Sequence, residues 1–193
     1  MARRSDHTRE ELIQLAVSEG TRLIESEGIS GFSARAAAAR MGYTVGTLYH
    51  LFGSLDGYLL HLNGATLDLW HDQLTATLKR KPKQPVHALA RAYIAFARKH
   101  YHRWTALFEH HLPEGESLPG WYAEKLARLF TLLEKQLPPT ARQDHKKAAA
   151  LSRLVWSGIH GICMLSLSGK LEAVGAESAE KMADRLVDAL LTD

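Results

Sequence analysis

The sequence predicts an all-α protein of about nine helices, with a small N-terminal domain over residues 1–54 and a larger one over residues 55–193. Apolar residues recur at spacings of three and four, as in "LIQLAVSEGTRLI" and "EKLARLFTLLEKQL", which is the periodicity of amphipathic helices. The alternating β-branched pattern of strands is scarce. Breaks in the helical pattern fall at residues 28–32, 42, 53, 79–85, 112–120, 138–139 and 169–178.

Length and composition favour a soluble protein. A chain of 193 residues with 46% apolar content can bury a substantial core. The single cysteine, Cys163, excludes an intramolecular disulfide, and the N-terminus lacks the apolar segment of a signal peptide. We see no apolar run of about 20 residues, so we expect a cytoplasmic protein without a membrane span. The net charge is only +3, and the six arginines of residues 1–53 are matched by six acidic residues, so charge alone does not indicate nucleic-acid binding.

The first elements read as a helix, a tight turn and a second helix. Ser33 can cap a helix over residues 34–41, and Gly42 can end it. Thr44 can cap the next helix, over residues 45–51, and Ser54 can cap a long fourth helix that extends to about residue 78. This arrangement is typical of a helix-turn-helix unit.

The short helix over residues 45–51 carries several side chains suited to contact. Leu48 and Phe52 are four residues apart and can face the core, which turns Val45, Gly46, Tyr49 and His50 outward. A glycine within a helix is unfavourable, so Gly46 suits a backbone that another molecule approaches closely. Short helix pairs with a glycine turn are also common in all-α domains, and the spacing alone leaves DNA binding open.

A resemblance extends this interpretation. The segment "GFSARAAAARMGYTVGTLYHLFGSLDGYL", residues 31–59, resembles the DNA-binding signature of the TetR family of bacterial transcriptional regulators. The positions that match the family pattern are Ala38, Gly42, Gly46, Thr47, Leu48, Tyr49, Phe52 and Ser54.

The resemblance implies that the third helix is a recognition helix in the DNA major groove. Thr44, Thr47 and Tyr49 would then contact phosphate or sugar, while Val45, Gly46 and His50 would face base edges. Ser33 and Arg35 would contact the flanking backbone. Arg3 and Arg4 could follow a neighbouring groove, although a solvated tail is the preferred interpretation.

Some positions depart from the family pattern. Tyr43 and Thr44 replace the usual valine and serine, and Leu51 replaces a common histidine or tyrosine. Leu55 stands where the family most often has a lysine that touches phosphate. This last departure concerns the strength of DNA binding rather than the fold.

A second resemblance lies in "SRLVWSGIHGICMLSLSGKL", residues 152–171, which is similar to the Trp-His-Gly-bearing C-terminal domain of one branch of these regulators. Trp156, His160 and Gly161 form the hallmark. Trp156 and His160 are four residues apart on one helical face, where they can form a packed seam or line a cavity. Gly161 can let another helix approach closely.

Aromatic residues are dense between residues 93 and 122. They can form an ordinary core, but in the family the fifth and seventh helices flank the ligand cavity, which favours a pocket for a lipophilic or aromatic effector. The expected pocket residues are Tyr93, Phe96, His100, Trp104, Phe108, Trp121, Tyr122, Trp156, His160 and Met164.

Catalysis and metal binding are not expected. Eleven histidines are present, but none has an established ligand spacing, and "HExxH" and "GxSxG" motifs are absent. Cys163 lies among apolar residues without a basic neighbour in sequence. We therefore expect no enzyme, no metal and no cofactor.

Two late helices predict a homodimer. Their apolar stripes exceed what a small domain needs internally, and they comprise Leu151, Leu154, Val155, Gly158, Ile162, Met182, Leu186 and Leu190. The preferred hypothesis is a one-component regulator, most simply a repressor, that binds a palindromic double-stranded DNA operator and is released by a small molecule. The alternative is a helical ligand-binding or interaction protein with weak DNA binding.

Overall fold

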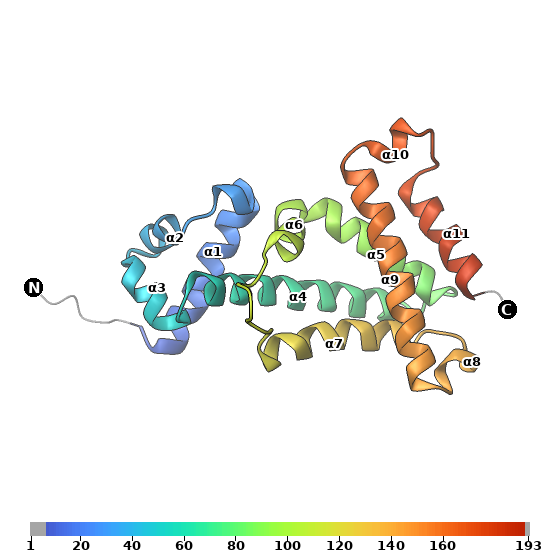
Figure 1. The fold of residues 1–193 in the computed structure, drawn as a ribbon, viewed down its shortest axis with the longest axis horizontal. Coiled ribbons are helices and arrows are strands. Elements are labelled where there is room, and N and C mark those ends of the chain that lie inside the picture. Colours follow the sequence, from blue (N-terminus) through green and yellow to red (C-terminus); the bar gives the residue numbers. More distant parts are fainter. Residues whose placement is uncertain (1–6, 192–193) are drawn as a thin grey trace, which may run out of the picture. The chain divides into compact units, whose positions relative to one another are not determined.

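The computed structural model of the chain describes residues 7–191, and over these residues the only regular structure is helical (Figure 1). This confirms the predicted all-α class. The helices are α1 (Arg9–Gly31), α2 (Ala34–Met41), α3 (Val45–Phe52), α4 (Leu55–Lys79), α5 (Pro85–Lys99), α6 (Tyr101–Glu109), α7 (Gly120–Glu134), α8 (Pro139–Arg142), α9 (His145–Leu167), α10 (Lys170–Ala173) and α11 (Ala179–Leu191).

The described residues form eleven helices instead of about nine. Two of them, α8 and α10, have only four residues each. The chain also breaks at His100, whose φ and ψ of −117° and 42° separate α5 from α6. No glycine or proline marks this position, so the sequence pattern did not predict the break. In α1 the expected break near residue 28 is a kink, at Gly28 with φ of 72°.

The chain divides into two compact units. Among the described residues, unit 1 contains residues 7–68 and 100–122, and unit 2 contains residues 69–99 and 123–191. Helix α4 begins in unit 1 and ends in unit 2. The boundary after residue 54 was predicted from the lengths and breaks of the helices, and it stays a prediction.

In unit 1, α1 contacts α2, α3 and α6, and side chains of α4 pack against it. The Tyr58 hydroxyl donates to the Ala16 carbonyl at 2.6 Å, and both residues are buried. Gly20 allows this close approach, because an added Cβ would lie 2.8 Å from a methyl carbon of Leu62. Helix α6 packs against α1, and the Asn63 amide donates to the Ala106 carbonyl at 3.3 Å. Helix α6 is therefore part of the unit that contains the helix-turn-helix.

Unit 2 is organised around α9, which packs against α5, α8, α10 and α11. Along the contact between α5 and α11, Arg91 binds Asp184 through both carboxylate oxygens, at 3.1 and 2.6 Å. His87 pairs with Asp188 at 2.8 Å, and Arg98 pairs with Glu180. Two arginine–carboxylate ion pairs and one histidine–carboxylate contact thus lie along the contact of these two helices.

One helix of the described chain, α9, is long and apolar enough to cross a membrane by length and composition alone. No apolar segment of this length was expected from the sequence. Only 28% of its apolar window is buried. The core helix of a soluble protein passes the same test, so this single helix is weak evidence for a membrane span.

Candidate DNA-binding surface and ligand site

The turn between α2 and α3 follows the predicted local chemistry, with one exception. Ser33 accepts a hydrogen bond from the Ala36 N–H at 3.1 Å, and Gly42 ends α2 in the left-handed conformation, with φ of 76°. Ser54 accepts from the Gly57 N–H at 2.9 Å at the start of α4. Thr44 occupies the capping position of α3 but accepts no backbone hydrogen bond. Its hydroxyl lies 3.3 Å from that of Thr47 instead.

Most of the predicted DNA-contacting side chains are on the surface. Tyr49 is 44% exposed, and Arg35 and His50 are also exposed. At Gly46 an added Cβ would meet only Thr44 Oγ1, at 3.6 Å, so the backbone of α3 is open there. Val45 differs from the prediction, because it is half-buried and packs against the core of unit 1. Its contribution to an outward surface is correspondingly smaller.

The core and two contacts from the N-terminal segment hold α3 in place. Leu48 is buried, and the Phe52 ring stacks on Tyr58 with a centroid distance of 4.7 Å. Arg9 donates to the Leu51 carbonyl at 3.3 Å. His7 Nδ1 lies 3.0 Å from the Tyr43 hydroxyl, a contact between residues 36 positions apart that local sequence patterns do not reveal.

The start of α4 lies next to this surface in the chain. Leu55 is its first residue and is 39% exposed, so a longer polar side chain has access to solvent there. A carboxylate oxygen of Asp56 lies 3.0 Å from His110 Nε2. This hydrogen bond links the segment after α6 to the start of α4. Arg3 and Arg4, the proposed groove arm, lie outside the described residues.

A second candidate site is a series of ring contacts in unit 2, contributed by α4, α5, α7 and α9. The Trp70 ring contacts Tyr93 and Phe96, with centroid distances of 5.0 and 5.9 Å. The Tyr93 hydroxyl is hydrogen-bonded to His160 Nδ1 at 2.7 Å. His160 in turn stacks on Trp156 with a centroid distance of 5.4 Å.

The series continues from α9 to α7. The Trp156 ring contacts Phe130 edge-on at 5.7 Å, and the Arg153 guanidinium lies 4.6 Å from the centre of the Phe130 ring. The predicted face of Trp156 and His160 is therefore a packed aromatic seam with a polar hydrogen bond inside it. Phe130 and Trp70 were not among the predicted residues, because neither lies in the dense aromatic segment.

Two polar groups of this seam have unusual environments. Burial lowers the pKa of His160, because desolvation disfavours the imidazolium form. The indole N–H of Trp70 is buried and has no hydrogen-bond acceptor in the part of the chain that the structure describes. A buried donor without a partner is uncommon in proteins. Trp70 is therefore a candidate donor to a bound molecule or an ordered water.

The other predicted pocket residues do not belong to this seam. His100, Trp104, Phe108, Trp121 and Tyr122 belong to unit 1, where Trp104 contacts Phe108 at 5.0 Å and Trp121 contacts His61 at 4.7 Å. Burial raises the pKa of Tyr122 to about 12. Met164 is 45% exposed, so the structure does not enclose it. A single pocket formed by all ten residues stays a prediction.

A third candidate site is an exposed face of α9, which runs through Leu154 and Gly161. Leu154 is 54% exposed. At Gly161 an added Cβ would meet no atom within 4 Å, so the close helix that this glycine was expected to admit is not a neighbour within the described chain. Gly158 instead faces Leu186 of α11. Val155 was predicted to belong to the apolar stripes that form the dimer interface, but it is fully buried and belongs to the core.

Cys163 and the acidic and histidine side chains are candidate reactive groups or metal ligands. Burial raises the pKa of the Cys163 thiol to about 11, which leaves it protonated and unreactive near neutral pH. Between residues 7 and 191, no group of three or more histidine, cysteine, aspartate or glutamate residues is arranged to hold a metal ion.

The family model described as "Tetracyclin repressor-like, C-terminal domain" matches residues 86–190, more than half of the chain. The chain belongs to the TetR family. Its members are transcriptional regulators, and the helix-turn-helix of unit 1 agrees with that assignment. No curated protein matches the chain in sequence.

Solved structures share the TetR fold over nearly the whole chain. A protein of unknown function from Rhodococcus sp. RHA1 superposes with a TM-score of 0.74 at 17% identity, covering 98% of this chain and 97% of that one. The transcriptional regulator FadR from Bacillus subtilis, solved with stearoyl-CoA, gives a TM-score of 0.67 at 11% identity and coverages of 93% and 97%. A TetR transcriptional regulator from Rhodococcus sp. RHA1 gives 0.65 at 16% identity, with 96% of each chain covered. At these identities the likeness concerns the fold.

Proposed function

We propose that this TetR-family protein is a cytoplasmic one-component repressor, which binds a palindromic DNA operator as a homodimer and is released by a small lipophilic molecule. The observation that carries the proposal is the surface of α2 and α3. It combines an open backbone at Gly46 with exposed Tyr49, His50 and Arg35. Such a short helix can enter the major groove while its neighbour contacts the phosphate backbone.

The proposed DNA contacts follow from side-chain chemistry. Thr44, Thr47 and Tyr49 carry hydroxyls that donate to phosphate oxygens, and Arg35 adds a cation beside them. His50 and the backbone at Gly46 face the base edges, where hydrogen bonds discriminate among base pairs. Ser33 and Val45 play smaller parts, because Ser33 is engaged as a helix cap and Val45 is half-buried.

The proposed dimer forms through α9 and α11. Leu154, which is 54% exposed, and the open side of Gly161 supply an apolar face that the described chain leaves partly uncovered. The low burial of the apolar window of α9 supports the same assignment. Two such helix pairs, related by a twofold axis, form a four-helix interface.

The proposed effector site includes the aromatic seam of unit 2. Its rings favour a flat or lipophilic molecule, and the unpaired Trp70 N–H favours one with a hydrogen-bond acceptor. The stearoyl-CoA bound to FadR, which shares this fold, supports a lipophilic class. The ligand acts only through its differential affinity for the two states of the protein, and α4 is the proposed transmitter because it belongs to both units.

The test is operator binding by the full chain, measured by gel shift and footprinting with DNA fragments from the promoter region of its own gene. We expect a protected palindrome, and we expect His50→Ala to change base preference at particular positions. His111→Ala, which alters an exposed histidine outside α3, is the matched control. No protection of any fragment by a folded dimer would refute the proposal.

A second function has one specific observation in its favour. Leu55 stands where the family most often has a phosphate-binding lysine, so the first residue of α4, although 39% exposed, carries no positive charge. A helical ligand-binding or interaction protein with weak DNA binding would fit this departure. Ligand binding without any operator protection would identify that function.

A further inference from the structure

Unit 2 carries a dense group of positive side chains, at the turn between α4 and α5 and around α8. We call this group the basic surface. It comprises Lys79, Arg80, Lys81, Lys83, Lys135, Arg142, Lys146 and Lys147. These are eight of the chain's 24 lysines and arginines, although the net charge of the whole protein is only +3. All eight are exposed.

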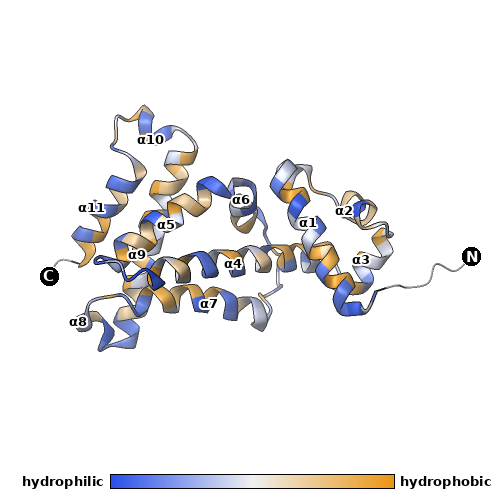
Figure 2. Cartoon of the chain, turned by 180° about the vertical axis from the view of Figure 1, so that it is seen from behind, coloured by the Kyte–Doolittle hydropathy of each residue, from blue (hydrophilic) through white to orange (hydrophobic). Residues whose placement is uncertain are grey.

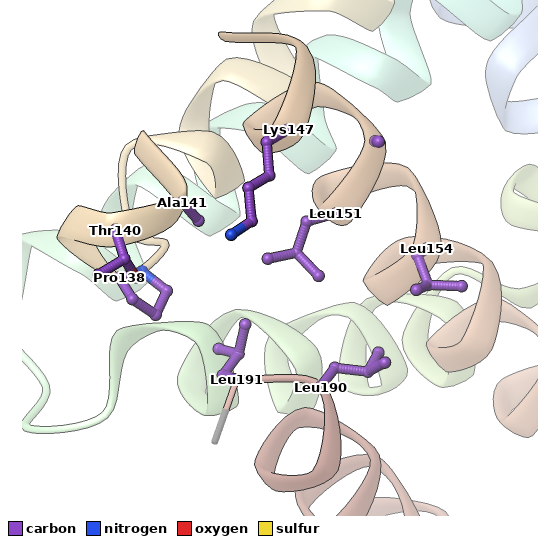
Figure 3. A pocket seen from close by; sticks show the side chains of 9 residues that line it. Pro138, Thr140, Ala141, Lys147, Leu151, Leu154, Leu190 and Leu191 are labelled. Atoms are coloured by element: carbon purple, nitrogen blue, oxygen red, sulfur yellow. The ribbon is translucent and has the colours of Figure 1, made fainter. Parts of the chain in front are cut away.

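Two grooves show that these segments adjoin one another. A groove of about 440 Å³ is lined by Gln84 and Pro85 from the turn and by Lys135 and Arg142 from either side of α8. A second groove, of about 310 Å³, contains Lys147 and shares Pro138 and Leu191 with the first (Figure 3). Figure 2 shows the same region as strongly hydrophilic around α8 and the start of α9.

The eight cations are not neutralised by ion pairs. Within residues 7–191, none of them forms an ion pair with a carboxylate, whereas the arginines of α5 and Arg153 are all paired. The nearest acidic residues in sequence have other roles. Asp144 accepts from backbone N–H groups at the start of α9, and Glu134 binds Arg153 and Ser152.

The composition of the surface identifies its partner. The turn "KRKPKQ" contains no aromatic or aliphatic side chain that could insert into lipid. The second groove contains four leucines. Leu151, Leu154 and Leu190 belong to the apolar stripes that we assign to a second copy of the chain, and Leu191 packs against a buried cluster of the same unit. What remains is a set of exposed cations on a turn and on helix ends, which suits a regularly spaced polyanion.

We propose that the basic surface binds the phosphate backbone of duplex DNA without sequence preference, as a second DNA contact separate from α3. The binding depends on counterion release, since each cation that neutralises a phosphate displaces condensed salt ions from the DNA. A dimer bound to its operator through α3 thereby has a further surface for another stretch of DNA.

The experiment measures the binding of the full chain to a short duplex without a palindrome, by fluorescence anisotropy at several salt concentrations. The variant is Arg80→Gln/Lys81→Gln/Lys83→Gln, and the matched control is Lys99→Gln/Lys170→Gln/Lys181→Gln, which removes three exposed cations of the same unit. We expect the variant to bind at least about tenfold more weakly at low salt. The slope of its log affinity against log salt concentration should be less steep by somewhat under about 3 units per chain. The control should resemble the natural protein.

Two further measurements separate the basic surface from the helix-turn-helix. Tyr49→Ala/His50→Ala should keep salt-dependent binding to the non-operator duplex, and adding the triple substitution should remove it. Complete loss in Tyr49→Ala/His50→Ala alone would overturn the proposal. Equal losses in the triple variant and in its control would also overturn it, because they would reflect net charge rather than a surface.

The remaining outcomes concern folding and the identity of the partner. Thermal melts verify folding, and Arg80→Gln/Lys83→Gln avoids Lys81, whose φ is 51°, if the triple variant is unstable. Vesicles of phosphatidylglycerol and phosphatidylcholine serve as a competing polyanion, and capture by vesicles with no binding to the duplex would overturn the DNA assignment. If the natural protein recognised no operator but still bound the non-operator duplex through the basic surface, only the proposed repressor function would be refuted.

Discussion

At the scale of a single residue, substituting Gly46 tests whether DNA approaches the backbone of α3 closely. An alanine there would meet only Thr44 Oγ1, at 3.6 Å, and alanine favours a helix over glycine by up to about 1 kcal/mol. Gly46→Ala should therefore leave the free energy of unfolding unchanged or slightly higher. It should weaken operator binding, because the added methyl group holds the DNA away from the helix backbone. A thermal melt and a gel shift measure the two effects.

Gly20→Ala is the matched comparison for the same chemical change. Its added Cβ would lie 2.8 Å from a Leu62 methyl carbon inside the contact of α1 with α4, so it should lower the free energy of unfolding by about 1 to 3 kcal/mol. Unchanged operator affinity in Gly46→Ala would show that the DNA does not approach α3 at this position.

His160 predicts a pH dependence of stability. Burial lowers its pKa, so the unfolded chain binds a proton at this residue more readily than the folded chain. The resulting stabilisation is complete above the ordinary histidine pKa of about 6.5 and declines as pH falls toward the lowered folded value. As pH falls from about 7 to about 5, the free energy of unfolding should decrease less in His160→Gln than in the natural protein. Thermal melts across this range measure the difference, with His111→Gln as the control, and parallel curves for His160→Gln and the natural protein would contradict the prediction.

At the scale of the helix, the start of α4 is the informative element. Leu55 is its first residue and is 39% exposed, so Leu55→Lys should fold normally. If this helix end lies beside the DNA backbone, the added cation tightens operator binding and steepens the salt dependence by somewhat under about 2 units for a dimer. Base preference should barely change. Operator affinity at several salt concentrations, beside a thermal melt, measures the effect, and an unchanged slope in a folded variant would place this helix end away from phosphate.

Helix ends that depend on local chemistry could be predicted from the sequence. Ser33, Gly42 and Ser54 act through atoms only a few residues away, and the structure places their caps as expected. The break at His100 has no glycine or proline, and α6 is held by contacts with α1 and α4 that are distant in sequence.

The orientation of helix faces was harder to predict. Periodicity gives the spacing of apolar residues but not which of two apolar faces meets the core, so Val45 and Val155 were assigned to the outside. The Thr44 hydroxyl was expected to cap α3, yet it pairs with Thr47. The unpaired Trp70 N–H depends on all its neighbours in space, and no sequence motif marks it.

At the scale of the whole molecule, the exposed face of α9 predicts the oligomeric state. Leu154→Glu places a charge on a residue that is 54% exposed in the single chain and that we expect to be buried in a dimer. The variant should sediment as a folded monomer at micromolar concentration, whereas the natural protein should sediment as a dimer. Val174→Glu is the control, because Val174 is 78% exposed and lies outside α9 and α11. A natural protein that sediments as a monomer would contradict the assigned interface.

The membership of α6 in unit 1 has a practical consequence for protein engineering. A fragment that ends after residue 68 would contain the whole helix-turn-helix but would lack residues 100–122. Such a fragment would lose the packing of α6 against α1, and it would lose the Ala106 carbonyl that accepts from the Asn63 amide. A chimera that exchanges DNA specificity between relatives therefore needs two grafted segments, residues 1–68 and residues 100–122, taken from the same parent.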